Sequence, residues 1–365
     1  MGSVKDLITL NKPQDHEPGL GIFQFSNRYS VFDWGEMPNH IPHKGSAICT
    51  IGAHFFELLQ QYCVSNRNVS GHQIDSHYRG IIAPEGGITS IHQIKTPPQQ
   101  MLVNLVRVIK LSFQEGHYDY GGYNTENVNY LIPLEIIYRN TIPAGSSVFG
   151  RIDRGELTLE ELGLNHYPKP GESLPHPFFD WSTKLEQTDR YLSKQEAIRI
   201  IHLNSSQWTN MLEILSTVNT LISQEITKLG LQNDDGKIEC AIDYKGDVIL
   251  VDVIGAPDEC RFSRGTTPIS KEIARDYYRT TPWYQDVIAA KQKAKEMGRK
   301  DWKSLCSSAP DPLPKELLEI ISQMYMSTAN GLIERQLFNS PPLTEVIEKY
   351  KNWQVQSHQQ TPHCP

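Results

Sequence analysis

One carboxylate lies inside an aliphatic stretch of the sequence, where a charge is costly to bury. Residues 247–262 read DVILVDVIGAPDECRF, and valine, leucine and isoleucine flank Asp252 there. An unpaired carboxylate in such surroundings would lose its hydration without compensation. The stretch therefore predicts a buried strand whose Asp252 has a charged partner.

The preceding strand offers candidates for that partner. The pattern KIECAIDY, a turn at residues 245–246 and then DVILVDV predicts a β-hairpin. Cross-strand register makes Glu239 a near neighbour of Asp252, and two adjacent carboxylates favour a proton or a metal ion between them. Mg²⁺ held by both carboxylates and by phosphate oxygens would satisfy that charge. The alternative is a structural ion pair of Asp252 with Lys237 or Arg261.

Two arginines stand next to turns that could hold a phosphate group. Arg139 ends the apolar strand PLEIIYRN and precedes NTIPAGSS, in which Ser146 supplies a hydroxyl next to a glycine. A guanidinium beside such a turn can bind phosphate through charge-assisted hydrogen bonds. Arg261 follows the turn APDEC in the same way. The alternative for each arginine is an ordinary surface position, with Asp258 as a local partner for Arg261.

Further charged residues lie in two other segments. In NRYSVFDWGEMPNHIPHKG, residues 27–45, Asp33 follows two apolar residues and Lys44 precedes a glycine. That lysine could neutralise a phosphate as a point charge. Ser182 and Lys184 in FFDWSTKLE could form an anion-binding turn, and the same segment could instead be a helix N-cap.

The elements that would position these residues alternate along the chain. Apolar periodicity and turn residues predict them. The predicted strands are 21–26, 101–113 and 133–140, and the predicted helices are 50–63, 193–203, 206–230 and 314–337. The Gly-, Asn- and Tyr-rich residues 114–130 are expected to form a long loop. This order predicts an α+β fold with a strand-rich lobe, a mixed lobe and closing helices.

Length and composition limit the classes of protein that fit. The chain has 365 residues, more than one hydrophobic core usually serves, so two or more lobes are expected. Its net charge of −7 argues against nucleic acid as the main partner. No apolar run is long enough to span a bilayer, and six scattered cysteines without a CxxC pair favour a reducing cytoplasm. Pockets for small anionic ligands remain compatible with this composition.

Taken in order along the chain, these clusters resemble one protein family. Five stretches are similar to motifs of phosphoribosylaminoimidazole-succinocarboxamide synthase, also called SAICAR synthetase: NRYSVFDWGEMPNHIPHKG, PLEIIYRNTIPAGS, LPHPFFDWSTKLE, DDGKIE and VDVIGAPDECRF. The C-terminal PLPKELLEIISQMYM fits the family's closing helix. The resemblance spans nearly the whole chain, and five ordered elements are more specific than any single motif.

The resemblance implies a two-lobed enzyme that uses ATP and Mg²⁺. Such enzymes join L-aspartate to the carboxylate of carboxyaminoimidazole ribonucleotide (CAIR) through an acyl phosphate, giving SAICAR, ADP and phosphate in purine biosynthesis. The implied division is a β-rich ATP-binding lobe at 1–132, an α/β lobe for substrate and Mg²⁺–ATP at 133–268, and a helical segment at 269–365.

The resemblance also assigns roles by position in this sequence. The residues expected in the chemistry are Lys237, Asp235 and Asp33. Those expected to bind substrate are Arg139, Ser146, Arg261, Lys44, Ser182, Lys184 and Arg275. Lys5, Glu239 and Asp252 are expected to bind the nucleotide, with Glu239 and Asp252 also holding Mg²⁺.

Several positions depart from the family pattern. Ser3 replaces a lysine expected near the phosphates, Asn27 stands where an aspartate is usual, and Val253 replaces a glutamate. Residues 114–130 and 284–312 look like additions. These departures leave open a related amide ligase with another azole or amine, a small-molecule kinase, or a nucleotide-binding protein without turnover. A monomer and a homodimer both fit.

Overall fold

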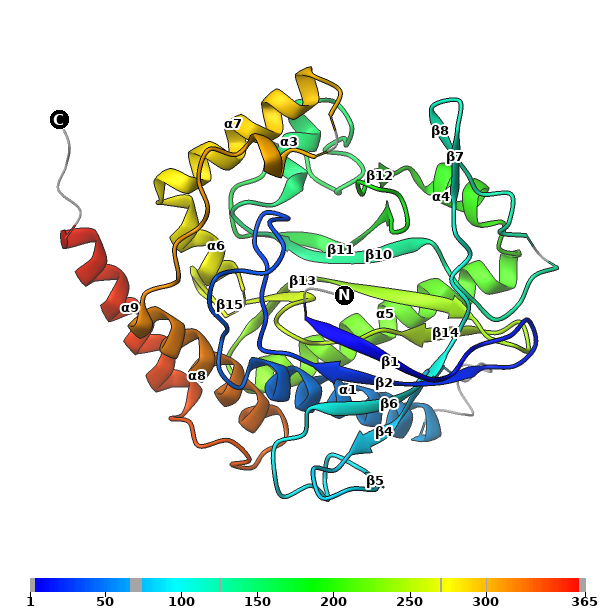
Figure 1. Ribbon diagram of the computed structural model, residues 1–365, viewed down its shortest axis with the longest axis horizontal. Coiled ribbons are helices and arrows are strands. Elements are labelled where there is room, and N and C mark those ends of the chain that lie inside the picture. The colour runs from blue at the N-terminus through cyan, green and yellow to red at the C-terminus, as the bar shows by residue number, and fades with distance from the viewer. Residues whose placement is uncertain (1–3, 66–73, 125, 270, 300, 361–365) are drawn as a thin grey trace.

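The computed structural model describes the chain apart from residues 1–3, 66–73, 125, 270, 300 and 361–365 (Figure 1). Two large sheets and a series of helices make it an α+β protein, as predicted. Among the residues described, none of the helices combines the length and apolar character that crossing a bilayer requires. Ser3, one of the departures from the family pattern, lies outside the described residues.

The smaller sheet is built from the N-terminal third of the chain. Its order is β1-β2-β6-β4-β5, and neighbouring strands are antiparallel. The strands are β1 (Lys5–Asn11), β2 (Gly19–Phe25), β4 (Tyr78–Ile82), β5 (Ile88–Thr89) and β6 (Gln100–Leu105). Helix α1 (Lys44–Ser65) packs on β2, β4 and β6, because its apolar side chains recur at helical spacing. The strand predicted at 21–26 and the helix predicted at 50–63 are confirmed.

The strand predicted at 101–113 is wrong in its second half. β6 ends at Leu105, and the chain then bonds to a different strand, β9 (Tyr130–Leu131). The Arg107 N–H donates to the carbonyl of Asn129 at 2.9 Å, and the Leu131 N–H donates to the carbonyl of Arg107 at 2.8 Å. Strand structure resumes only in an exposed hairpin, β7 (Ser112–Gln114) and β8 (His117–Asp119). Apolar periodicity cannot show such a change of partner.

The larger sheet carries most of the predicted site residues. Its main path is β12-β11-β10-β13-β14-β3; β9 and β15 also pair with β13, and β16 pairs with β15. The strands are β3 (Asp75–Ser76), β10 (Leu134–Ile142), β11 (Glu172–Thr183), β12 (Tyr191–Leu192), β13 (Gln232–Ile242), β14 (Val248–Val251), β15 (Cys260–Arg264) and β16 (Thr267–Pro268). Because β3 and β9 belong to the first 132 residues, this sheet draws on both predicted lobes. The boundaries at 132 and 268 stay predictions.

The predicted hairpin forms, with one difference at its end. Gly246 lies in the turn with a φ of +92°, and Glu239 pairs with Val251 across β13 and β14. Asp252 was expected within the strand. β14 ends at Val251, so Asp252 lies just beyond it. In an extended strand Asp252 would face away from Glu239, since neighbouring side chains alternate. Its left-handed φ of +66° redirects the carboxylate toward Glu239.

Two helices cover one face of the larger sheet (Figure 1). They are α4 (Lys194–Ile201) and α5 (Ser205–Lys228), which confirm the helices predicted at 193–203 and 206–230. A capping box formed by Asn204 and Gln207 begins α5, and Gly230, with a φ of +70°, follows its end. α5 packs on β10, β13 and β14, which fixes the strands that carry the site.

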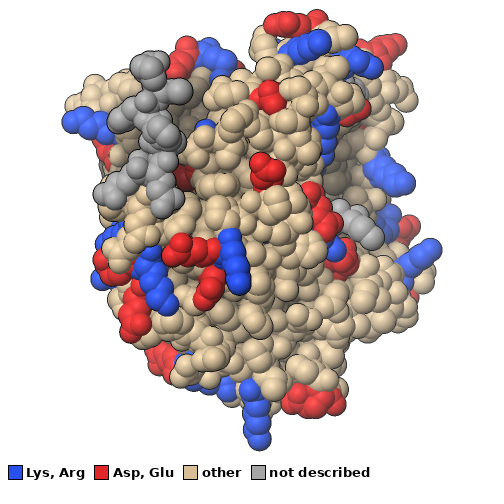
Figure 2. All heavy atoms as spheres, turned by 60° about the vertical axis from the view of Figure 1, so that its left-hand side comes forward, with Lys and Arg blue, Asp and Glu red and all other residues tan. Residues whose placement is uncertain are grey.

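The C-terminal helices lie together at one side of the molecule (Figure 1). They follow the short α3 (Ser147–Asp153) in sequence and comprise α6 (Glu272–Arg279), α7 (Pro282–Glu296), the short η1 (Lys303–Leu305), α8 (Lys315–Leu332) and α9 (Leu343–Gln360). α8 confirms the helix predicted at 314–337, although it ends at Leu332. It packs on α1, so one core runs from the smaller sheet to α9. Figure 2 shows acidic and basic side chains interspersed on the face drawn.

Candidate active site

A cavity of about 490 Å³ lies over β13, where strands β10 and β12 approach helices α6 and α7. Its lining is rich in charge. The basic members are Arg139, Lys237, Arg261, Lys271, Arg275, Arg279 and Lys291, and the acidic members are Asp33, Glu135, Asp235, Asp258 and Glu259. A concave surface on which cations outnumber carboxylates attracts small anions.

One face of β13 presents a row of charged side chains. Asp235, Lys237 and Glu239 alternate along the strand and therefore lie on the same face. At a rise of about 3.3 Å per residue, the row is about 13 Å long. The strand lies close to β10 at Gly236, where an added Cβ would be 2.3 Å from the Tyr138 hydroxyl oxygen. The glycine is therefore needed for this row to sit against β10.

Two guanidinium groups meet at the Asp235 end of the row. Arg139 is 3% exposed, and its Nη1 lies 3.3 Å from Asp235 while its Nη2 lies 3.1 Å from Asp180. Arg261 donates to the Asp235 carboxylate through Nε at 2.8 Å and also through Nη2. Burial opposes these charges, but the carboxylates outweigh it and raise the pKa of both arginines. Asp235 thus fixes two planar donors at one end of the cavity.

Lys237 occupies the middle of the row between two carboxylates. Its Nζ lies 2.6 Å from Glu135 and 3.3 Å from Glu259. Burial alone would lower the pKa of Lys237, but Glu259 and Glu135 outweigh burial and raise it. The ammonium therefore keeps its charge throughout the neutral range and can stabilise an anion in the cavity.

The far end of the row is a cluster of two carboxylates and two lysines. Lys5 of β1 pairs with Asp252, and Lys184 pairs with Glu239. Burial, and next the charge of Asp252, raise the pKa of Glu239 to about 8. Burial alone would also raise the pKa of Asp252, but Lys5 outweighs burial and holds it below its usual value.

This cluster corrects the ion-pair alternative for Asp252. The cations considered from sequence, Lys237 and Arg261, pair with other carboxylates. The partner is Lys5, which comes from the other sheet and is remote in sequence. The near contact of Asp252 with Glu239 is confirmed by their mutual electrostatic interaction.

The carboxylates of Glu239 and Asp252 fit a divalent cation. Burial, and next the charge of Asp252, raise the pKa of Glu239 and so disfavour its ionised form, and a cation placed between the two carboxylates would stabilise that form. Mg²⁺ prefers such oxygen ligands and usually completes its shell with phosphate oxygens. Within the described part of the chain there is no group of three or more potential metal ligands. A metal here would depend on the nucleotide for its remaining ligands.

The two serines of the AGSS turn have different positions. The Ser146 hydroxyl accepts from the Val148 N–H at 3.4 Å and caps α3, so its side chain is buried. Ser147 lines the cavity, and its hydroxyl lies 2.8 Å from that of Tyr191. A substrate role for Ser146 stays a prediction. The family resemblance left Ser146 and Ser147 as alternatives, because RNTIPAGS has one residue more than the common motif.

Lys44 and Ser182 do not line the cavity. The Lys44 ammonium is fully buried, 2.7 Å from Asp258 and 3.0 Å from the Arg28 carbonyl. Asp258 does line the cavity, so Lys44 can act on a ligand only through that carboxylate. Ser182 is buried within β11, opposite Glu135 of β10. Their assignment as substrate-binding residues stays a prediction.

Helix α6 supplies cations that sequence reasoning mostly missed. Arg275 was predicted, and Lys271 and Arg279 line the same cavity from positions four residues to either side of it. Residues four apart share one helix face, so this spacing is the signal that could have identified all three. Arg275 and Arg279 pair with Glu272 at 2.8 and 2.7 Å. Asp33 and Lys291 complete the lining at the cavity mouth.

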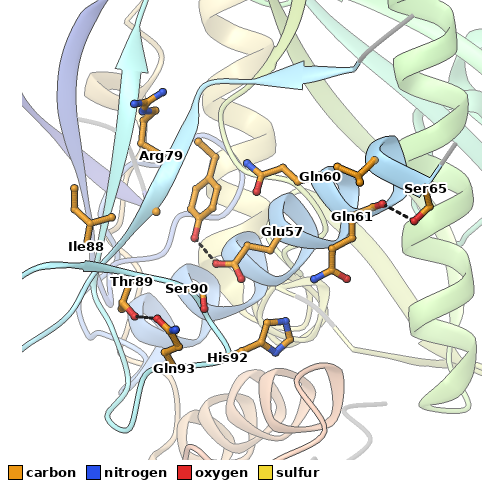
Figure 3. Close-up of a pocket in the computed structure, with 13 residues that line it drawn as sticks. Glu57, Gln60, Gln61, Ser65, Arg79, Ile88, Thr89, Ser90, His92 and Gln93 are labelled. Atoms are coloured by element: carbon orange, nitrogen blue, oxygen red, sulfur yellow. Dashed lines mark hydrogen bonds between the residues drawn. The ribbon is translucent and has the colours of Figure 1, made fainter. Parts of the chain in front are cut away.

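A larger hollow, of about 920 Å³, lies elsewhere, between α1 and the β4–β5 hairpin (Figure 3). Glu57 there accepts hydrogen bonds from the Tyr78 hydroxyl and the Ile91 N–H, both at 2.8 Å. Most of the other polar lining is neutral, including Gln60 and Gln93. Because the described residues that line this hollow include no cluster of cations, the chemistry is assigned to the cavity over β13.

Comparison with known proteins decides the family. A sequence model of the SAICAR synthetase family matches residues 1–297. The chain belongs to the SAICAR synthetase family. An Archaeoglobus fulgidus protein, provisionally named a phosphoribosylaminoimidazole-succinocarboxamide synthase, is 43% identical over 96% of this chain and 99% of its own length. The phosphoribosylaminoimidazole-succinocarboxamide synthase of Thermoplasma volcanium is 30% identical over 78% of this chain and 87% of its own.

Solved SAICAR synthetase structures share the fold. SAICAR synthase from Saccharomyces cerevisiae, complexed with SAICAR, aligns with a TM-score of 0.59 and 21% identity over 92% of this chain and 94% of its own. A type-2 SAICAR synthetase in complex with ADP aligns with a TM-score of 0.52 and 19% identity over 86% and 99%. These likenesses confirm the predicted fold.

Proposed function

We propose that this SAICAR synthetase family member joins L-aspartate to the carboxylate of CAIR with ATP, giving SAICAR, ADP and phosphate. The family assignment supports the reaction. One observation links this reaction to particular residues. A single face of β13 runs from the two guanidinium groups at Asp235 to the two carboxylates of Glu239 and Asp252. The reaction needs such an arrangement, because the ribonucleotide phosphate and ATP must lie on opposite sides of one reacting carboxylate.

The guanidinium end suits the ribonucleotide phosphate. Arg139 and Arg261 are both oriented by Asp235, and a guanidinium held by a carboxylate keeps further N–H groups for a phosphate oxygen. Ser147 and Arg275 also line the cavity and add a hydroxyl group and a third cation. CAIR would bind with its phosphate here and its azole ring along β13.

The middle of the row suits the carboxylate that reacts. A carboxylate is a poor electrophile, so the γ-phosphoryl group of ATP first passes to one of its oxygens and ADP leaves. The amine nitrogen of aspartate then attacks the acyl carbon, loses a proton, and phosphate departs. Negative charge accumulates in both steps, and the permanently charged Lys237 ammonium beside that carboxylate would stabilise it.

The carboxylate end suits the nucleotide. Lys5 and Lys184 would face the triphosphate, and Glu239 and Asp252 would hold Mg²⁺, which supplies charge neutralisation to the phosphates. Beyond Glu239, the same face of β13 reaches Ala241, which belongs to an apolar cluster with Ile249 and Val251. An apolar surface next to phosphate ligands is suitable for a nucleobase.

We propose a cytoplasmic setting on the basis of the cysteines and the ligands. The five cysteines among the described residues are free thiols, which favours the reducing cytoplasm as the site of action. The partners we propose are small molecules: ATP, CAIR and L-aspartate.

The test measures ADP release from purified protein with ATP, Mg²⁺, CAIR and L-aspartate, omitting one component at a time. We expect release only when all are present, and mass spectrometry should show a product of CAIR plus aspartate less one water. Lys237→Met should abolish turnover, and the exposed Lys349→Met on α9 should not. CAIR-dependent turnover that ignores aspartate would instead identify a kinase, and turnover with a different amine would identify another amide ligase.

A further inference from the structure

An ion pair spans the mouth of the cavity over β13. The Nζ of Lys291, on α7, lies 2.8 Å from the Oδ2 of Asp33, and both residues line the cavity. The two side chains are 39% and 84% exposed. An ion pair in this much water contributes little stability and exchanges readily with other ions.

The other cations of the cavity are differently placed. Arg139 is buried against two carboxylates, and Lys237 is held between Glu135 and Glu259. Arg279 is shared between Glu272 and Asp276. Each of these three cations lies between two carboxylates, whereas among the described residues Lys291 pairs with one carboxylate, Asp33, which is 84% exposed. The ion pair of Lys291 is also more exposed than those of the other cavity cations, so its carboxylate can exchange readily for one of a ligand.

The backbone at Asp33 is held in an unfavourable conformation. Phe32 and Asp33 are consecutive non-glycine residues with φ of +54° and +62°. The left-handed region is disfavoured for phenylalanine and tolerated better by aspartate, so contacts around Phe32 must maintain this conformation. The Phe32 ring lies 4.6 Å from the ring of Tyr284 and 5.8 Å from the guanidinium of Arg279. Helices α6 and α7 thus hold Asp33 at the mouth.

Lys291 is itself positioned from its own side. Its Nζ lies 4.9 Å from the centre of the Trp302 ring, a cation–π contact that keeps the ammonium over the cavity mouth. Trp302 packs near Trp34, whose N–H donates to the carbonyl of Val31 in the loop that carries Asp33. Both charges are therefore held in place before any ligand arrives.

We propose that Lys291 binds a carboxylate of the amino acid co-substrate, replacing its contact with Asp33. This inference rests on the proposed ligase function. An opposed ammonium and carboxylate complement an amino acid, which carries the same two charges. Lys291 binds a carboxylate of the substrate aspartate. The Asp33 carboxylate, released from Lys291, accepts a hydrogen bond from the ammonium of that substrate. The preference for an amine with two carboxylates is then due to Lys291, which lies in the 284–312 segment, outside the five family motifs.

The test is a steady-state comparison of Lys291→Gln with the wild type. Loss of one charge-assisted contact should raise the KM for aspartate about tenfold, with smaller changes in kcat and in the KM for CAIR and ATP. Lys291→Arg keeps the charge and should restore most of the affinity. Lys293→Gln, on an exposed part of the same helix and absent from the cavity lining, is the matched control and should match the wild type.

Succinate separates binding from chemistry, because it has both carboxylates of aspartate and no amine. It should inhibit the wild type in competition with aspartate and inhibit Lys291→Gln about tenfold less well. An unchanged KM for aspartate in an active Lys291→Gln would overturn the inference and leave the ligase function standing. A wild type that releases no ADP with CAIR and aspartate would reject the ligase function, and this inference with it.

Discussion

Replacing Glu239 by glutamine should remove a pH dependence from the stability of the free protein. Burial and the charge of Asp252 raise the pKa of Glu239 to about 8. The folded state therefore retains a proton that the unfolded chain, with a carboxyl pKa of about 4.3, has already released. Between these two values the folded protein binds more protons than the unfolded chain, so the free energy of unfolding falls as pH rises.

The magnitude follows from that pKa difference. One proton bound in the folded state and absent from the unfolded chain changes the free energy of unfolding by about 1.4 kcal/mol per pH unit. Glu239 should therefore account for a loss of roughly 2–3 kcal/mol between about pH 5.5 and about pH 7.5. Glu239→Gln has the same shape and no titration, so the variant should lack this part of the slope. Urea unfolding of both proteins at each pH gives the difference directly and cancels contributions from other groups, such as the buried His77, whose pKa is lowered to about 4.

Glu348→Gln, an exposed substitution on α9, is the control and should follow the wild type at every pH. Nucleotide binding gives a second measurement. Because a metal ligand must be deprotonated, binding of Mg²⁺–ATP near neutral pH should release about one proton in the wild type. Calorimetry in two buffers of different ionisation enthalpy should detect that proton, and Glu239→Gln should release none. Equal pH slopes for the variant and the wild type would refute this account of the cluster.

Three further substitutions test other parts of the site. Asp252→Asn should lower turnover by orders of magnitude, since the metal contributes on the order of several kcal/mol. It should also lower the free energy of unfolding of the free protein in urea, because Lys5 loses its carboxylate partner; normal activity per folded molecule would contradict the metal assignment. Arg139→Lys should weaken CAIR binding by about tenfold in calorimetry, because one ammonium cannot contact Asp180 and Asp235 as the guanidinium does; unchanged affinity would remove the residue from the site. Lys44→Met should destabilise the fold by about 3–5 kcal/mol, because it leaves the buried Asp258 carboxylate without its cation; a variant that unfolds at the same urea concentration as the wild type would contradict that pairing.

Much of the local structure follows from the sequence. The periodicity of residues 50–63 and 206–230 predicted helices that form, because an amphipathic pattern specifies its own secondary structure. The hairpin was also predicted correctly, since Gly246 is needed for its turn. The strand at 101–113 was not, because after Leu105 the hydrogen-bonding partner changes to a segment more than 20 residues away.

The site divides in the same way between local pattern and tertiary contact. Alternation within DDGKIE places Asp235, Lys237 and Glu239 on one face, and this geometry is contained in the sequence itself. The pairing of Asp252 with Lys5 is not, because it joins two sheets and depends on a left-handed residue that redirects the carboxylate. Lys291 belongs to no motif and enters the cavity only because α7 packs across its mouth. The sequence by itself determined the row of charges, whereas the folded chain decided the counter-ion of each charge, since Coulomb energies depend on distances that only tertiary packing sets.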